Sequence, residues 1–326
     1  MTHPSRRQLL AGAAAAALPL SAAHAAYPEK PILYLCPLPA GGLLDTHMRF
    51  LAEHAGRTLG QQVLVDSKPG ATATLAATNI LHARPDGYSL ATMMVTSLRF
   101  PYVNDVSWDP LRDFTYIIGL SNIVIGIVVK ADAPWRTVEE LLEAGRRNPE
   151  KLNYGTSGIG GTGHLTALEI ERASGARFTH VPFKGGPETM QAVLGGHIDF
   201  MCDGAAWAPH VDSGKFRLLT MATENRVKRY PDAPTLRERG IDVVGWSPYG
   251  IVGPKGMAPE LVKTIHDAFK NASDDPGNAA LLERFVQEPW YRDPAGYRAW
   301  AEEYRTAIKP AMVRAGLMKG DRKSVV

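Results

Sequence analysis

Four glycine-rich turns are the features of this sequence best suited to chemistry. Each follows an apolar run typical of a strand and precedes a run typical of a helix. The first N–H groups of a helix lack partners within it and carry the positive end of its dipole, so they bind anions without a metal. We therefore predict a main-chain site for a small carboxylate. The turns are Pro39-Ala40-Gly41-Gly42, Lys68-Pro69-Gly70, Thr156-Ser157-Gly158-Ile159-Gly160-Gly161 and Phe183-Lys184-Gly185-Gly186.

The motifs of known enzyme classes match this sequence less well. Gly158, Gly160 and Gly163 have the spacing of a dinucleotide-binding turn, but segment 177–183 lacks the acidic residue that such a site places about 20 positions later. Ile159 stands where a nucleophile elbow requires glycine. Metal-ligand spacings of His, Cys, Asp and Glu are absent. We predict no catalytic residue, metal or cofactor, and keep a secreted α/β enzyme acting on a small organic acid as the alternative.

Residues 1–26 have the composition of an export signal. Arg6 and Arg7 precede an alanine-rich apolar stretch, and Ala23-His24-Ala25 is a small-x-small cleavage pattern. We expect cleavage near Ala25 and a soluble protein in the periplasm. The paired arginines favour the twin-arginine route, although an ordinary secretory signal also contains two basic residues. No later segment reaches the roughly 20 apolar residues of a transmembrane helix.

The composition limits the classes of binding partner and the number of domains that we expect. Without Arg6 and Arg7 the chain has 34 Lys and Arg against 33 Asp and Glu, a net charge of +1. This balance does not indicate binding to nucleic acid or to an acidic membrane. A mature chain of about 300 residues with 45% hydrophobic content predicts two lobes. We expect Cys36 and Cys202 to be separate buried thiols, with a disulfide between them as the alternative.

Strand-like and helix-like periodicities alternate along the mature chain. Asp45 precedes a helix with one apolar face, Thr137 and Glu140 form a capping box, and Pro187 begins a helix that Gly195 ends. The alternation predicts doubly wound parallel α/β sheets. The expected elements are strands over 32–36, 63–65, 90–95, 198–202 and 216–223, and helices over 45–59, 72–82, 187–194, 259–272 and 294–317.

Two long apolar runs, 123–129 and 243–252, are predicted to cross between the lobes. We expect the first domain to comprise 27–126 and 246–326, and the second to comprise 127–245. The fold class is therefore α/β, a two-lobed binding protein of the type II kind. A hinge made of two crossing strands places a ligand cleft between the lobes, and closure of the lobes buries a small molecule there.

Several motifs follow one another in a characteristic order along the mature chain. They are Pro37-Leu38-Pro39-Ala40-Gly41-Gly42-Leu43-Leu44-Asp45, Val65-Asp66-Ser67-Lys68-Pro69-Gly70, Arg84-Pro85-Asp86-Gly87-Tyr88, Asp113-Phe114, Tyr154-Gly155-Thr156-Ser157-Gly158, Val181-Pro182-Phe183-Lys184-Gly185-Gly186 and Gly195-Gly196-His197-Ile198-Asp199. In this order and spacing the sequence resembles the Bug, or TctC-like, solute-binding proteins of tripartite tricarboxylate transport systems. The likeness spans essentially the whole mature chain.

The resemblance implies a monomeric periplasmic receptor that closes on a small organic anion and docks on inner-membrane permease subunits. The anion would be a mono- or dicarboxylate, an amino acid or an aromatic acid. A ligand-sensing receptor without transport is a further alternative. In this family two loops grip one ligand carboxylate as a pincer, and the second lobe contacts the ligand from the other side. The implied pincer residues are Ala40, Gly41, Gly42, Asp45, Phe183, Lys184, Gly185 and Gly186, and those of the second lobe are Thr156, Ser157, Gly158, Thr162, His164 and Asp203.

Two segments depart from the usual family pattern. Ala71 and Thr72 stand where many members have further glycines, and we expect both to contact the ligand. After the third strand, small polar residues usual in the family are replaced by a segment that begins with Thr96, another expected contact, and includes Arg99. Arg99 either pairs with a distal carboxylate of the ligand or lies in solvent.

Some of these residues also have a structural interpretation. Asp45 can cap a helix, and His164 at a helix start is commonly a capping or packed histidine. Asp203 at a strand end is commonly a turn residue. Lys184 either steers anions or covers apolar surface with its stem.

Overall fold

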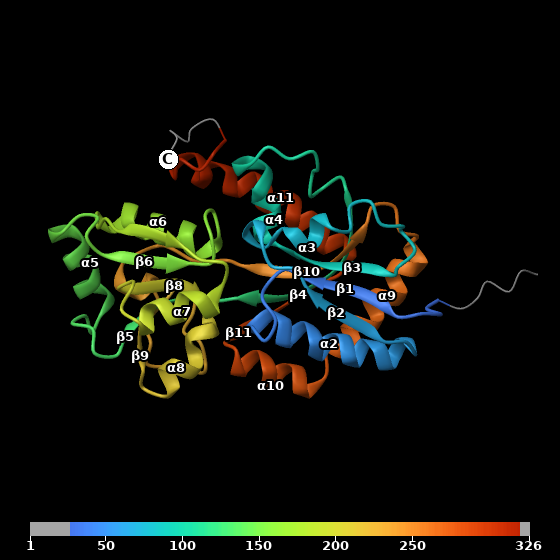
Figure 1. Cartoon of the computed structure of the whole chain (residues 1–326), viewed down its shortest axis with the longest axis horizontal. Coiled ribbons are helices and arrows are strands. Elements are labelled where there is room, and N and C mark those ends of the chain that lie inside the picture. Colours follow the sequence, from blue (N-terminus) through green and yellow to red (C-terminus); the bar gives the residue numbers. More distant parts are fainter. Residues whose placement is uncertain (1–26, 320–326) are drawn as a thin grey trace, which may run out of the picture.

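The strands of the protein form two separate sheets, one in each of two lobes that lie side by side (Figure 1). The structure is a computed structural model that describes residues 27–319. The predicted export signal, residues 1–26, lies outside the described residues. We call the lobe with the six-stranded sheet lobe 1 and the lobe with the five-stranded sheet lobe 2. The predicted two-lobed α/β fold is confirmed.

Lobe 1 contains a mixed sheet with the strand order β11-β4-β10-β3-β1-β2. Strand β1 is parallel to β2 and β3, whereas β10 is antiparallel to β3 and β4, and β11 is antiparallel to β4. The strands are β1 (Ile32–Cys36), β2 (Val63–Ser67), β3 (Ser89–Met94), β4 (Phe114–Ile123), β10 (Pro248–Pro254) and β11 (Gln287–Arg292). The helices are α2 (Leu43–Leu59), α3 (Leu75–Thr78), α4 (Val95–Val103), α9 (Pro259–Ser273), α10 (Pro276–Arg284) and α11 (Pro294–Arg314).

Lobe 2 contains a second mixed sheet with the strand order β7-β6-β8-β5-β9. Strand β6 is parallel to β7 and β8, whereas β5 is antiparallel to β8 and β9. The strands are β5 (Ile125–Lys130), β6 (Asn153–Thr156), β7 (Thr179–Pro182), β8 (Phe200–Gly204) and β9 (Phe216–Met221). The helices are α5 (Val138–Arg147), α6 (Thr162–Ser174), α7 (Gly186–Leu194) and α8 (Ala208–Asp212).

The chain crosses between the lobes directly after β4 and again before β10. Strand β4 ends at Ile123, and β5 begins in the other sheet at Ile125. The return passes through 222–247 and inserts β10 between β3 and β4. A strand that arrives from the other lobe has no crossover helix on its own sheet, so it need not run parallel to its neighbours. The sheets are therefore mixed rather than parallel as predicted, and the domain boundaries after residues 126 and 245 stay a prediction.

A left-handed turn replaces the first part of the helix predicted over 72–82. Ala71, Thr72 and Ala73 have φ angles of 46°, 52° and 62°, and the right-handed helix α3 covers only Leu75–Thr78. A left-handed conformation costs a residue with a side chain about 1–2 kcal/mol. The turn ends at Thr74, which returns to right-handed dihedrals.

Other local signals match the structure. The Thr137 side chain accepts a 3.3 Å hydrogen bond from the N–H of Glu140 at the start of α5, as the capping box predicts. Proline stands in the first turn of α7, and Gly195 follows its last residue. Cys36 and Cys202 are free and fully buried, which confirms separate thiols. Buried side chains form one core cluster that extends from lobe 1 through the crossing strands to Trp207 in lobe 2.

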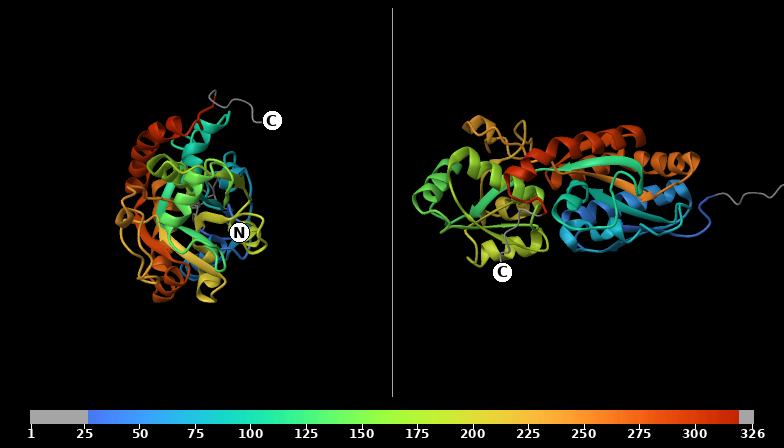
Figure 2. Two further views of the ribbon diagram at one scale, coloured as in Figure 1. Left: turned by 90° about the vertical axis from the view of Figure 1, so that its left-hand side faces the viewer. Right: turned by 90° about the horizontal axis from the view of Figure 1, so that it is seen from above.

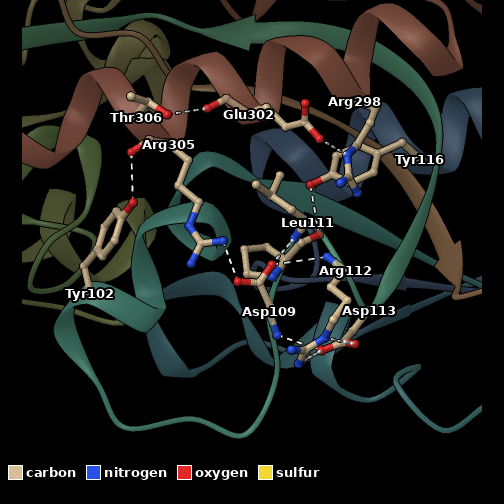
Figure 3. A network of polar contacts seen from close by, with 11 residues as sticks. Tyr102, Asp109, Leu111, Arg112, Asp113, Tyr116, Arg298, Glu302, Arg305 and Thr306 are labelled. Atoms are coloured by element: carbon tan, nitrogen blue, oxygen red, sulfur yellow. Dashed lines mark hydrogen bonds and ion pairs between the residues drawn. The ribbon is translucent and has the colours of Figure 1, made fainter.

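Helix α11 lies along lobe 1 and its last turns approach lobe 2 (Figure 2). Figure 3 shows the polar contacts that hold it there. Arg305 of α11 donates to Asp109 at 2.5 Å, and the Tyr102 hydroxyl of α4 donates to the Arg305 carbonyl oxygen at 3.0 Å. Near the end of α11, Arg314 lies 3.4 Å from Glu169 of α6. These contacts fix α11 against α4 and connect it to lobe 2.

Candidate functional site

A cavity of about 90 Å³ lies between the two lobes. Four helix N-termini, two from each lobe, contribute to its walls. Gly42 caps α2 and Thr96 lies in the first turn of α4, whereas Gly161 caps α6 and Gly185 caps α7. The lining residues are Leu38, Pro39, Gly42, Leu43, Ala73, Met94, Thr96, Ile123, Ile125, Ser157, Gly161, Thr162, Gly163, Gly185, Gly186, Pro187, Asp203, Gly204, Ala206 and Ser247.

The loops before α2 and α7 approach each other from opposite lobes. A Cβ atom added to Gly185 would lie 3.3 Å from the Pro39 ring, and one added to Gly186 would lie 3.0 Å from the Ala206 Cβ. A Cβ on Gly42 would lie 3.0 Å from the Pro39 carbonyl oxygen. Side chains have little room at these three positions, so the helix starts present backbone to the cavity.

The starts of α4 and α6 contribute hydroxyl groups. Thr96 Oγ1 is buried and has no hydrogen-bond partner within the part of the chain that the structure describes. Thr162 Oγ1 donates to Ser247 Oγ at 3.2 Å. A Cβ on Gly163 would lie only 2.0 Å from the carbonyl oxygen of Cys202, so glycine is required for α6 to pack this closely on β8. A buried unpaired hydroxyl costs about 1–3 kcal/mol, and a polar ligand atom would supply the partner that Thr96 lacks.

Asp203 is the charged residue among those that line the cavity. Its Oδ2 accepts from the Ser157 hydroxyl at 2.6 Å, and its Oδ1 accepts from the backbone N–H of Gly204 at 2.8 Å. Loss of hydration by burial raises the pKa of Asp203 to about 6, although the two hydrogen bonds oppose this shift. The cavity thus combines helix N-termini and hydroxyl groups with one carboxyl that titrates near neutrality.

The structure brings together seven of the seventeen residues predicted for the site. Those that line the cavity are Gly42, Thr96, Ser157, Thr162, Gly185, Gly186 and Asp203. Those that lie outside its lining are Ala40, Gly41, Asp45, Ala71, Thr72, Thr156, Gly158, Phe183, Lys184 and His164.

Asp45 holds the first glycine loop in place. Its carboxylate accepts from the N–H of Gly41 at 2.9 Å, from the Ser67 hydroxyl at 2.7 Å and from the Arg49 guanidinium at 2.9 and 3.0 Å. Burial opposes its ionisation, but these hydrogen bonds outweigh that effect and lower the pKa of Asp45. The capping interpretation is wrong, because the residue that caps α2 is Gly42.

His164 holds the long glycine loop of lobe 2. Its Nδ1 accepts from the N–H of Gly160 at 3.0 Å, and its ring stacks on that of His180 with 3.9 Å between centroids. Burial lowers the pKa of His164 to about 3, and the charges of His180 and Arg99 act in the same direction. The ring is therefore neutral near pH 7. Thr156 extends this cluster, since its hydroxyl lies 2.7 Å from His180 Nε2.

The remaining predicted residues lie at the rim or beneath the loops. Thr72 reaches across to lobe 2, where its Oγ1 lies 3.5 Å from the Ile159 carbonyl oxygen and its methyl group lies beside Gly158. Lys184 is exposed, and its backbone N–H donates to the Glu188 carboxylate at 3.1 Å. Ala40, Gly41 and Ala71 are exposed, and Phe183 lies half-buried against Gly155.

Sequence reasoning missed several lining residues. Gly161 and Pro187 lie at helix starts within or beside the predicted turns, and the same argument would have found them. Ser247, Ile123 and Ile125 come from the crossing segments, where no local signal marks a ligand contact. Among residues 27–319, no group of three or more His, Cys, Asp or Glu side chains is arranged to hold a metal. Over the same range, no helix combines the length and apolarity needed to span a bilayer.

A sequence model described as tripartite tricarboxylate transporter family receptor, TctC, matches residues 47–317. The chain belongs to this family. A UPF0065 protein from the gbd 5' region of Cupriavidus necator is 42% identical to this TctC-type receptor over 304 residues, which are 93% of each chain. The periplasmic binding protein BugD is 28% identical, with a TM-score of 0.84 over 90% of this chain and 99% of that one.

A third relative extends the comparison to a liganded protein. MatC from Rhodopseudomonas palustris, with bound malate, is 25% identical, with a TM-score of 0.81 over 87% of this chain and 99% of that one. Family and fold together make this protein a solute-binding receptor of the TctC type, a family of periplasmic binding proteins.

Proposed function

We propose that this TctC-type receptor captures a small carboxylate between its lobes and delivers it to the inner-membrane permease subunits of a tripartite tricarboxylate transporter. One observation carries the proposal: four helix N-termini, two per lobe, meet at one cavity whose lining residues include no Lys or Arg within the described chain. An anion gains about 0.3–1 kcal/mol from each helix end, and about 1.5–3 kcal/mol from each N–H donor that it accepts from. Such a site favours a small anion over a neutral sugar or a cation.

The division of the helix ends between the lobes supports capture by closure. A ligand that touches α2 and α4 in lobe 1 and α6 and α7 in lobe 2 binds the closed form more tightly than the open one. It therefore shifts the population toward the closed form by the difference between the two affinities. The two predicted domains, 27–126 with 246–326 and 127–245, would move relative to one another when the cleft closes. The receptor would do this as a monomer.

We divide the predicted site residues by their position relative to the cavity. We assign direct ligand contact to the seven lining residues Gly42, Thr96, Ser157, Thr162, Gly185, Gly186 and Asp203. Asp203 would accept from a donor group of the ligand, such as a hydroxyl or an ammonium group. Asp45 and His164 act as positioning residues, since each holds one of the glycine loops. The malate bound to MatC supports a carboxylate as the class of ligand.

Calorimetric titration of the mature protein with a panel of organic acids, amino acids and neutral sugars tests the ligand class. We expect micromolar or tighter binding for at least one carboxylate and none for neutral sugars. Selective binding of a sugar or a metal ion would refute the carboxylate assignment. Turnover of a bound acid, detected by mass spectrometry, would favour the enzyme alternative. Binding without uptake by cells that contain the permease would favour a sensor.

A pair of variants in one loop tests the location of the site. Gly186→Leu places a side chain at the start of α7, next to Ala206, and should abolish capture of the acid identified above. Lys184→Leu introduces the same side chain two residues earlier at an exposed position outside the lining. It should leave affinity within about threefold of wild type. Equal affinities in the two variants, at unchanged melting temperature, would place the ligand elsewhere.

A further inference from the structure

Arg99 is a buried arginine without an acidic partner among the residues that the structure describes. Its side chain is 2% exposed. The guanidinium donates from Nη1 to the Tyr304 hydroxyl at 2.8 Å and from Nη2 to Thr162 Oγ1 at 3.1 Å. Its Nε is buried and has no hydrogen-bond partner in the described part of the chain. Among residues 27–319, no carboxylate lies within ion-pairing distance of it. A buried cation of this kind is costly unless a counter-charge replaces the lost hydration.

Arg99 lies directly behind the wall of the ligand cavity. Thr96, which lines that cavity, precedes it by three residues on α4, so the two side chains share a face of the helix. Thr162, the acceptor for Nη2, lines the cavity as well. On the other side, Arg99 and Thr162 line a second cavity of about 280 Å³, bounded by α6, α11 and the crossing segment 242–246. Arg99 and Thr162 thus contribute to a partition between the two cavities.

The carboxylates near this partition form ion pairs with arginines other than Arg99. Glu169 pairs with Arg172 at 2.8 Å and with Arg314 at 3.4 Å. Asp242 pairs with Arg237 at 2.8 Å.

Asp203 of the ligand cavity accepts from a hydroxyl and a backbone N–H rather than from Arg99. The fold holds the guanidinium in place through Tyr304, on a helix that the adjacent Arg305 anchors to Asp109 (Figure 3). The described residues thus hold a positive charge in a fixed position and provide no carboxylate to pair with it.

We propose that Arg99 is the counter-ion for a second acidic group of the ligand and makes this receptor selective for dicarboxylates over monocarboxylates. The inference rests on the proposed function, which places the first carboxylate at the helix starts of α2 and α7. The distal carboxylate accepts hydrogen bonds from those guanidinium N–H groups of Arg99 that do not donate to Tyr304 or Thr162. Arginine suits this role because its planar fork of donors matches a carboxylate and its charge is permanent.

The test compares each diacid with its own monoamide, which has the same length but one charge less. The probes are succinate, glutarate and adipate, each beside its monoamide, titrated calorimetrically into wild type, Arg99→Gln and Arg99→Lys. We expect the best diacid to bind wild type at least about tenfold more tightly than its monoamide. The ratio should fall to about one in Arg99→Gln and be partly kept in Arg99→Lys. Arg314→Gln, which alters another arginine of the second cavity, should keep the wild-type ratio.

Melting temperatures without ligand separate this role from a structural one. Removal of an unpaired buried charge should leave the melting temperature of Arg99→Gln equal to that of wild type or higher. A lower melting temperature with an unchanged diacid-to-monoamide ratio would make Arg99 a structural residue and overturn the inference. Equal affinity of wild type for diacid and monoamide would overturn it and leave the proposed function intact. Failure of wild type to bind any carboxylate would refute the proposed function itself.

Discussion

The Ser157 hydroxyl donates a 2.6 Å hydrogen bond to Asp203 Oδ2 at the wall of the interlobe cavity. Asp203 extends from the end of β8, and Ser157 follows β6, the neighbouring parallel strand. Desolvation raises the pKa of this carboxyl to about 6. The site therefore contains one group whose charge changes within the ordinary range of pH, next to the helix starts that we propose to hold an anion.

Affinity for an acid that is ionised throughout and has no hydroxyl or ammonium group to donate to Asp203 should increase as the pH falls from 8 to 5. Protonation of Asp203 removes a negative charge beside the ligand, and the gain is at most about tenfold per pH unit near its pKa. Asp203→Asn should abolish this dependence, which calorimetry at several pH values would show. For an acid with a hydroxyl or ammonium donor, the affinity of wild type should instead decrease as the pH falls, because protonated Asp203 accepts less strongly from that donor. The prediction fails if the affinity of wild type for an acid without a donor decreases as the pH falls.

Asp203 should also destabilise the unliganded protein at high pH. Its folded pKa of about 6 exceeds the ordinary value of 3.8, so the folded state binds more protons between these values. Its contribution to stability is then present below pH 3.8 and is lost as the pH rises through 6. Asp203→Asn should show a smaller loss of unfolding free energy between pH 4 and pH 8 than wild type, measured by urea denaturation.

Thr96→Val should weaken ligand binding about tenfold without lowering the stability of the unliganded protein. Among residues 27–319 the Thr96 hydroxyl has no hydrogen-bond partner, so its removal breaks no hydrogen bond in the described structure. Thr92→Val is the matched control. The Thr92 hydroxyl lies 2.6 Å from that of Tyr34 in the core, so this variant should lose about 1–2 kcal/mol of stability and keep its affinity. The prediction fails if Thr96→Val is as destabilised as Thr92→Val.

His164→Asn should reduce the loss of stability in acid. The folded pKa of His164 is lowered to about 3 from 6.5, so its contribution is fully present above pH 6.5 and is lost as the pH falls toward 3. Between pH 7 and pH 4 wild type should lose up to about 3 kcal/mol more than the variant. Urea denaturation at both values measures this difference. Parallel losses in the two proteins would show that His164 titrates normally.

Thr72→Gly should raise the unfolding free energy by about 1 kcal/mol, because glycine adopts the left-handed conformation of this turn without strain. Ala76→Gly, in the right-handed helix α3, should lower the unfolding free energy by a similar amount. Chemical denaturation of both variants checks the opposite signs. Destabilisation by both changes would mean that the contact of Thr72 with Ile159 of lobe 2 outweighs the strain.

Local signals explain which parts of the fold could be predicted. Thr137 with Glu140, Pro187 and Gly195 act through neighbours a few residues away, and the structure confirms each boundary. The prediction of a helix from residue 72 was wrong, because periodicity does not reveal that Ala71, Thr72 and Ala73 are left-handed. The direction of β10 was missed for a related reason, since the pairing of a strand depends on distant partners.

The site shows the same difference between features set by neighbouring residues and features set by distant ones. The sequence determined by itself that glycine turns precede helices, since the chemistry of a helix start depends on adjacent residues. This predicted an anion site at turns that include Gly42, Gly161 and Gly185. Only the tertiary structure decided which side chains line the cavity, and it directed Asp45 and His164 into the loops. Among residues 27–319, it left the hydroxyl of Thr96 without a hydrogen-bond partner and the guanidinium of Arg99 without an acidic one. Those outcomes depend on residues far apart in sequence, which meet only when the two lobes pack against one another.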